Sequence, residues 1–175
     1  MTAQAGDLVI CHSRGILGKA IRWAQRRLPD KRYSKWNHVA VLNKVVDGQW
    51  TIIQAQTKGV TDTMTLDKLY QRSDYEIVEI PEYVDRALEL DFLRSQVGQE
   101  YGWLSIVSCA FDMVLPDKVS VRSSGTWICS ALAGAALWYG GFEPAQKWPD
   151  LYTLTPAELA QACLGEASPS TGPAS

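Results

Sequence analysis

The residues with the clearest nucleophilic potential in this 175-residue chain are four cysteines and two histidines. The cysteines are scattered, at positions 11, 109, 129 and 163, and no Cys-x-x-Cys pair occurs. This spacing argues against a disulfide scaffold and against a zinc ribbon. It leaves thiol chemistry, in which a thiolate attacks a carbonyl group and an imidazole moves the proton.

Cys129 is the most informative of these residues because of the helix predicted around it. The segment 126–139, TWICSALAGAALWY, predicts a helix of small residues that ends at Gly140. If Thr126 is the N-cap, Cys129 is the third helical residue, where the partial positive charge of the helix N-terminus favours a thiolate. The alternative is a buried structural cysteine, which is a common place for this residue type.

His38 is the imidazole best placed to serve that thiol, because it begins a predicted strand over 38–46. A strand end holds the ring while its edge stays open; the alternative is a structural or solvent-exposed histidine. The competing pair, Cys11 and His12, lies within a predicted strand over 7–12, where adjacent side chains point to opposite faces. No residues with metal-ligand spacing accompany that pair, so the sequence predicts neither a metal nor a cofactor.

A third polar group usually orients such an imidazole, and the candidates are Gln54 and Gln56 in a predicted strand over 49–56. A strict two-residue turn at Asp47-Gly48 would place both glutamines on the face opposite His38. A longer turn or a bulge would place them on the same face. We therefore predict an irregular turn or a bulge that brings Gln54 within hydrogen-bond reach of His38, with Gln56 in reserve. The alternative is that either glutamine simply lies on the solvent-exposed face of its strand.

The remaining elements must bring these distant residues together. Strands dominate the first half of the chain, and helices dominate the second half. The further predicted elements are a helix over 16–28, an extended piece from Val60, a helical turn over 66–70, a strand over 75–80, and helices over 82–97, 103–115 and 155–164. This order predicts one α+β domain over 1–164, with an antiparallel sheet packed against helices, and a flexible Pro/Ser-rich tail over 165–175.

Composition narrows the classes of function. Hydrophobic residues make up 46% of the chain and charged residues 21%, which is typical of a soluble globular protein. Seventeen basic and 19 acidic residues give a net charge of −2, which argues against a general nucleic-acid binder. No apolar run reaches the length of a membrane span, and the N-terminal residues lack the features of a signal peptide. We therefore expect a cytoplasmic or virion-associated protein.

One loop, over 31–37, combines basic and aromatic residues. Lys31, Arg32 and Lys35 lie there beside Tyr33 and Trp36. The loop is either a solvated surface segment or a lip that contacts an anionic or polymeric substrate.

Four short motifs, taken in order, resemble the permuted NlpC/P60 papain-like cysteine hydrolases, of the branch that includes the YiiX/YebB-like bacterial and phage proteins. The motifs are Gly6-Asp7-Leu8-Val9-Ile10, Asn37-His38-Val39-Ala40-Val41, Ile53-Gln54-Ala55 with Gly59-Val60 after it, and Trp127-Ile128-Cys129-Ser130 at the head of a helix. The order is histidine, polar residue, cysteine, whereas ordinary NlpC/P60 domains run cysteine first. The resemblance covers roughly residues 6–160 by element order.

The resemblance implies a papain-like fold with the nucleophile at a helix N-terminus. It implies that Cys129 is the nucleophile, that His38 is the general base and then the acid, and that Gln54 orients the ring. The branch more often has a carboxylate at the position of Gln54, and related sequences often carry an acid at the position of Ala131. These departures bear on the strength of the activity more than on the fold.

The function implied by the resemblance is a cysteine hydrolase, a peptidase or amidase, whose expected substrate is bacterial cell-wall peptidoglycan. An acyltransferase or a lipid amidase would use the same residues on another acyl or amide substrate. A non-catalytic structural or adaptor subunit of a phage tail or a secretion machine would keep the fold without the chemistry.

Overall fold

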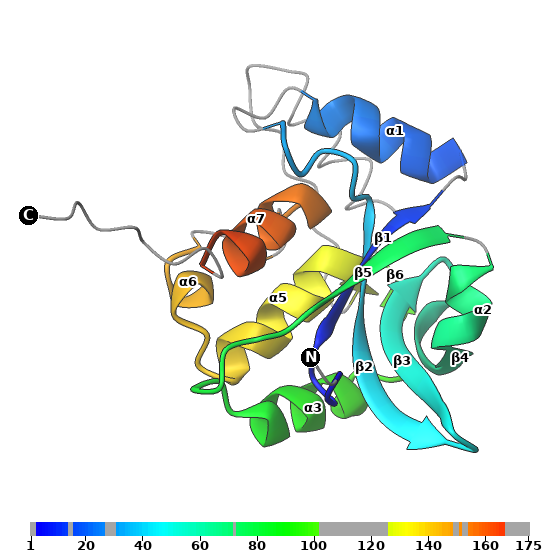
Figure 1. Ribbon diagram of the computed structural model, residues 1–175, viewed down its shortest axis with the longest axis vertical. Helices are drawn as coiled ribbons and strands as arrows, with labels where there is room; N and C mark the ends of the chain where they lie inside the picture. The colour runs from blue at the N-terminus through cyan, green and yellow to red at the C-terminus, as the bar shows by residue number, and fades with distance from the viewer. Residues whose placement is uncertain are drawn as a thin grey trace, which may run out of the picture.

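The protein is built on a five-stranded antiparallel sheet in the order β4-β3-β2-β1-β5 (Figure 1). The computed structural model describes residues 3–13, 16–26, 31–71, 73–101, 126–148, 151 and 154–166. The strands are β1 (Leu8–Ser13), β2 (His38–Val46), β3 (Gln49–Gln56), β4 (Gly59–Thr65) and β5 (Ser73–Val78). A separate parallel pair joins β6 (Glu100–Tyr101) to β7 (Thr126–Trp127).

Helices cover both faces of this sheet, so the architecture is mixed α+β, as predicted. The helices are α1 (Ile16–Gln25), α2 (Leu66–Tyr70), α3 (Arg86–Ser95), α5 (Cys129–Tyr139), α6 (Glu143–Gln146) and α7 (Pro156–Glu166). In Figure 1, α3, α5 and α7 lie on one side of the sheet, and α2 lies on the other. None of the helices in the described ranges is long and apolar enough to cross a membrane.

Alternate residues of each central strand supply two separate apolar clusters. Leu8 and Ile10 of β1 belong to the larger cluster, which includes Leu93 of α3 and Leu132 of α5. The intervening residues of β1 belong to a smaller cluster that is closed by α2. Its buried members are Val9, Cys11, Ala40, Leu42, Ile52, Leu66 and Leu69. Burial of both faces explains why β1 and β2 read as nearly continuous apolar runs rather than as alternating ones.

The hairpin of β2 and β3 contains the predicted irregularity, which lies within the strands rather than in the turn. The turn itself has two residues, Asp47 and Gly48, both with positive φ. Val46 therefore pairs with Gln49, but the register shifts between Leu42 and Val45. Two residues of β2 oppose Thr51 at this point, which is the arrangement of a β-bulge. The prediction of an irregular turn or a bulge is confirmed as a bulge with a regular turn.

Local capping sets the ends of two other helices. The Asp85 side chain accepts hydrogen bonds from the backbone N–H groups of Ala87 and Leu88. Helix α3 therefore begins at Arg86, and the prediction of a start at position 82 is wrong. At α7, Thr155 and Glu158 form the predicted capping box, with Oε2 of Glu158 2.9 Å from the Thr155 nitrogen and Oγ1 of Thr155 3.2 Å from the Glu158 nitrogen.

The ends of two further helices differ from their predicted positions, and two predicted segments cannot be compared. Helix α1 ends at Gln25, earlier than the expected position 28. Helix α7 continues to Glu166, two residues beyond the expected end. The expected helix over 103–115 and residues 167–175 of the expected tail lie outside the described residues.

Candidate active site

Cys129 is the first residue of α5, rather than the third. Thr126 and Trp127 are extended and pair with β6, so that Ile128 is the N-cap of α5. The prediction that Thr126 caps the helix is wrong, because this strand pairing continues the extended backbone to the cap. The new position still lies in the first helical turn, where backbone N–H groups have no acceptor within the helix.

The Cys129 sulfur is nearly enclosed, with the residue only 6% exposed. It accepts hydrogen bonds from the backbone N–H groups of Ser130 and Val39, and it is hydrogen-bonded to the His38 side chain. Burial raises the pKa of the thiol, but the charge of the His38 ring and these hydrogen bonds outweigh burial, and the pKa of Cys129 is lowered. The thiolate is therefore favoured by contacts from two elements, α5 and β2.

The His38 ring lies between Cys129 and Gln54. Its Nε2 is 2.7 Å from Oε1 of Gln54. An amide oxygen only accepts, so Nε2 carries a proton, and Nδ1 is the nitrogen left for the Cys129 sulfur. Burial lowers the pKa of His38, but the Cys129 thiolate and the hydrogen bonds to both neighbours outweigh it, and the pKa of His38 is raised. Opposite shifts on the two groups favour a thiolate–imidazolium pair.

Gln54 is 1% exposed, and both ends of its amide are used. Its Nε2 donates to the Met64 sulfur of β4 at 3.1 Å, which leaves Oε1 for His38. The register beyond the bulge pairs Val41 with Ile53, so that Gln54 lies diagonally across from His38. The predicted hydrogen bond between His38 and Gln54 is confirmed. Gln56 pairs with Gly59 of β4, and Gln54 is the glutamine that bonds to the ring.

Two buried polar residues that sequence reasoning missed hold the segment before His38. Asn37 accepts from the Ser13 nitrogen and donates to the backbone oxygens of Ser13 and Gly18. Gln25 of α1 donates to the Trp36 oxygen at 2.7 Å and accepts from the Ala157 nitrogen of α7. Together they tie α1, α7 and the entry to β2 into one unit. Gln25 could have been noticed in the sequence, because it is a polar residue at a position where the apolar spacing of the predicted helix expects a buried side chain.

Cys11 and His12, the competing pair, do not form a site. Cys11 is completely buried, and burial raises the pKa of its thiol far above the ordinary range. His12 turns to the other side, and its Nδ1 lies 3.0 Å from the Lys35 backbone oxygen. Within the part of the chain that the structure describes, no cluster of three histidine, cysteine or carboxylate side chains could hold a metal ion.

Cys129, His38 and Gln54 therefore come together from α5, β2 and β3, although 91 residues separate the cysteine from the histidine. Comparison with protein-family models and with curated proteins finds no match to this sequence.

Proposed function

We propose that this protein is a papain-like cysteine hydrolase that cleaves amide or peptide bonds, with bacterial cell-wall peptidoglycan as its substrate. The observation that carries the proposal is the continuous hydrogen-bonded series from the Cys129 sulfur through the His38 ring to the Gln54 amide. The peptidoglycan substrate rests on the resemblance to permuted NlpC/P60 hydrolases.

The first step is attack of the Cys129 thiolate on the carbonyl carbon of the scissile bond. A C–S bond forms, and the carbonyl π electrons move to oxygen. Backbone N–H groups in the first turn of α5 are positioned to stabilise that oxyanion, because helix N-termini favour negative charge.

The imidazolium of His38 then gives its Nδ1 proton to the leaving nitrogen, and the C–N bond breaks. An acyl-enzyme remains on the Cys129 sulfur. In the second half, His38 takes a proton from water, the resulting hydroxide attacks the thioester, and the thiolate leaves. Gln54 keeps Nε2 occupied throughout, so that Nδ1 remains the nitrogen that exchanges protons.

Substitution of the sulfur tests the proposal. Cys129→Ala and Cys129→Ser, assayed on purified muropeptides, should lose activity by about three orders of magnitude or more, because no nucleophile of similar strength remains. Cys163→Ala, which removes a buried thiol from α7, is the matched control and should retain activity. Full muropeptide cleavage by Cys129→Ala would exclude the mechanism. If the wild-type protein cleaved acyl amides but not muropeptides, the substrate class would move to lipids.

A further inference from the structure

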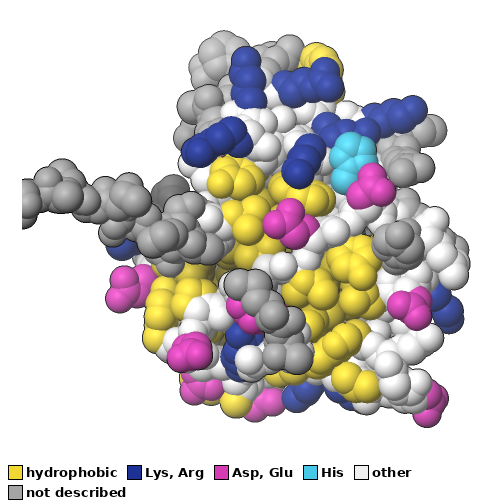
Figure 2. Space-filling view, in the orientation of Figure 1, with side chains coloured by type: hydrophobic (Ala, Val, Ile, Leu, Met, Phe, Trp, Pro, Cys, Tyr) yellow, Lys and Arg dark blue, Asp and Glu magenta, His cyan; other side chains and the backbone are white. Residues whose placement is uncertain are grey.

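The positive charge of this protein is concentrated in one short segment. Eight of the 17 basic residues, but only one of the 19 acidic residues, Asp30, lie between Arg14 and Lys35. The rest of the chain is strongly acidic, although the net charge is only −2. Figure 2 shows Lys and Arg side chains gathered over α1 and the segment after it, whereas the acidic side chains in this view lie mostly lower.

Helix α1 has one side packed against the protein and another side exposed to solvent in this basic segment. Gly18 and Gln25, seven residues apart, are buried and mark the side that packs against the protein. Lys19 and Arg26 are exposed, and Trp23 is 54% exposed among them. Helical periodicity places Trp23 on the side of α1 away from Gly18 and Gln25. An outward tryptophan flanked by cations is therefore built into a helix whose opposite side is anchored.

The segment after α1 also combines exposed basic residues with aromatic residues. Lys31, Arg32 and Lys35 are exposed. The Lys35 ammonium lies 4.3 Å from the centre of the Trp36 ring, and the Arg32 guanidinium lies 5.5 Å from that of Tyr33. These contacts hold the two exposed cations over aromatic rings, of which Trp36 is buried and Tyr33 is half-buried. We call the combined surface the basic pole; its described members are Lys19, Arg22, Trp23, Arg26, Lys31, Arg32 and Lys35.

We propose that the basic pole docks the protein onto the surface of an anionic phospholipid bilayer. Each lysine or arginine near such a surface contributes about 1 kcal/mol of attraction. Tryptophan prefers the interface between headgroups and acyl chains, where the ring is buried and its N–H stays among polar groups. Exposed Trp23 favours a bilayer over a duplex nucleic acid, because contacts to a phosphate backbone do not use an apolar ring on the helix. A single strand, whose bases could stack on the ring, is distinguished by the test below.

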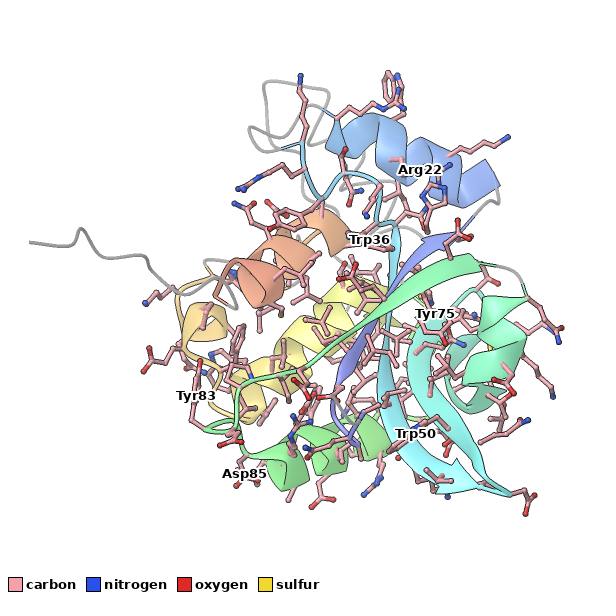
Figure 3. All side chains as sticks on the ribbon, in the orientation of Figure 1. Arg22, Trp36, Trp50, Tyr75, Tyr83 and Asp85 are labelled. Atoms are coloured by element: carbon pink, nitrogen blue, oxygen red, sulfur yellow. The ribbon has the colours of Figure 1, made fainter. Side chains whose placement is uncertain are left out.

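Docking would place the candidate active site beside the bilayer. Lys35 is three residues before His38, and its backbone oxygen contacts the ring of His12. Figure 3 shows Arg22 and Trp36 at the end of the sheet where β2 begins, which is also the end that carries His38. The proposal does not depend on catalysis, and its test uses no activity measurement.

Co-sedimentation of the full chain with lipid vesicles tests the proposal. The protein should bind vesicles that mix phosphatidylglycerol with phosphatidylcholine, but not vesicles of phosphatidylcholine alone, and added salt should weaken binding. The double variant Lys19→Glu/Arg26→Glu should weaken binding on the order of a hundredfold or more. The double variant Lys44→Glu/Lys58→Glu makes the same charge change at exposed residues of the β2–β4 region and should lose far less.

Substitution of Trp23 distinguishes binding to a bilayer from binding to a polyanion such as DNA. Trp23→Ala should weaken vesicle binding by about tenfold at constant salt. Binding to a single-stranded DNA probe should be weaker than binding to phosphatidylglycerol vesicles and unchanged by Trp23→Ala. Absence of vesicle binding at low salt, or equal losses in both lysine/arginine double variants, would overturn the proposal. Tighter binding to DNA than to vesicles would overturn it in favour of a nucleic-acid surface.

Discussion

The His38 imidazole and the Gln54 amide lie diagonally across β2 and β3, with 2.7 Å between Nε2 and Oε1. The bulge between Leu42 and Val45 makes this contact possible, because a regular hairpin with the same two-residue turn would put the two side chains on opposite faces. Ring orientation in the candidate site therefore depends on an irregularity several residues away.

Removal of the Gln54 amide should lower turnover more than substrate binding. Gln54→Ala should reduce kcat roughly tenfold to a hundredfold, corresponding to about 1–3 kcal/mol for an orienting hydrogen bond. KM should change little, because ring orientation matters most while the proton moves. The matched control is Gln56→Ala in the same strand, which should retain full turnover. Equal effects of the two substitutions would remove Gln54 from its positioning role.

A carboxylate at the same position should support the same chemistry. Gln54→Glu should keep or raise activity, because a negative charge beside Nε2 stabilises the imidazolium and raises the pKa of His38 further. The pH profile of kcat/KM should show that shift directly. A loss of activity as deep as that of Gln54→Ala would show that the amide donor to Met64 is indispensable.

The lowered pKa of Cys129 should appear in its alkylation kinetics. A group with a lowered pKa is deprotonated at lower pH, so iodoacetamide should modify Cys129 at pH values below the ordinary thiol range. His38→Ala should move the reaction to higher pH, because burial then acts without the opposing imidazolium. Cys11 is the internal control, since burial raises its pKa and should keep it unmodified in the same sample. Mass spectrometry of the labelled peptides distinguishes the two; an unreactive Cys129 would favour a non-catalytic scaffold.

Glu89 should make the protein less stable as the pH rises. The residue is fully buried, neither carboxyl oxygen has a hydrogen-bond partner among the described residues, and burial raises its pKa to about 8. Arg86 lowers this pKa and Asp7 raises it, but burial is the largest cause. The unfolded chain releases this proton near the ordinary glutamate value. Stability from this group is therefore present in full at low pH and is lost as the pH rises towards 8.

Glu89→Gln removes that pH dependence. Urea unfolding should show a gain in stability for the variant over wild type at pH 8 that exceeds the gain at pH 5 by roughly 2–4 kcal/mol. Glu82→Gln, at an exposed position, is the control and should show no such difference. Parallel pH dependence in wild type and Glu89→Gln would contradict the prediction.

Helix α1 should be sensitive to one added methyl group. A Cβ on Gly18 would lie 2.7 Å from both the Asn37 amide nitrogen and the Ser13 backbone oxygen. Gly18→Ala should therefore destabilise the protein by about 1–3 kcal/mol, despite the better helix propensity of alanine. Lys19→Ala, the exposed neighbour, should be nearly neutral. Thermal unfolding measures both, and a stabilised Gly18→Ala would show that α1 does not pack closely on Asn37.

Local sequence determined the elements that carry the candidate site. The ends of β2 and β3 match the predicted ranges, 38–46 and 49–56, because a β-rich run on each side meets a turn pair whose positive φ suits Asp47 and Gly48. The capping box of α7 was likewise readable, because the bonds between Thr155 and Glu158 involve residues three apart. Residue type narrowed the candidates to four cysteines and two histidines, and the predicted helix start and strand end favoured Cys129 and His38 among them.

Tertiary structure decided how those elements meet. The bulge that brings Gln54 onto the face of His38 is braced by two side chains: Arg94 of α3 bonds the Asn43 side chain, 51 residues earlier in the sequence, and Thr51 of the facing strand bonds the Lys44 backbone oxygen. Pairing of β7 with β6, about 25 residues earlier in the chain, moved the start of α5 from its predicted cap. Such contacts join residues far apart in the chain, and local propensity carries no information about them. The sequence therefore indicated which residues could react, and long-range packing determined that they touch.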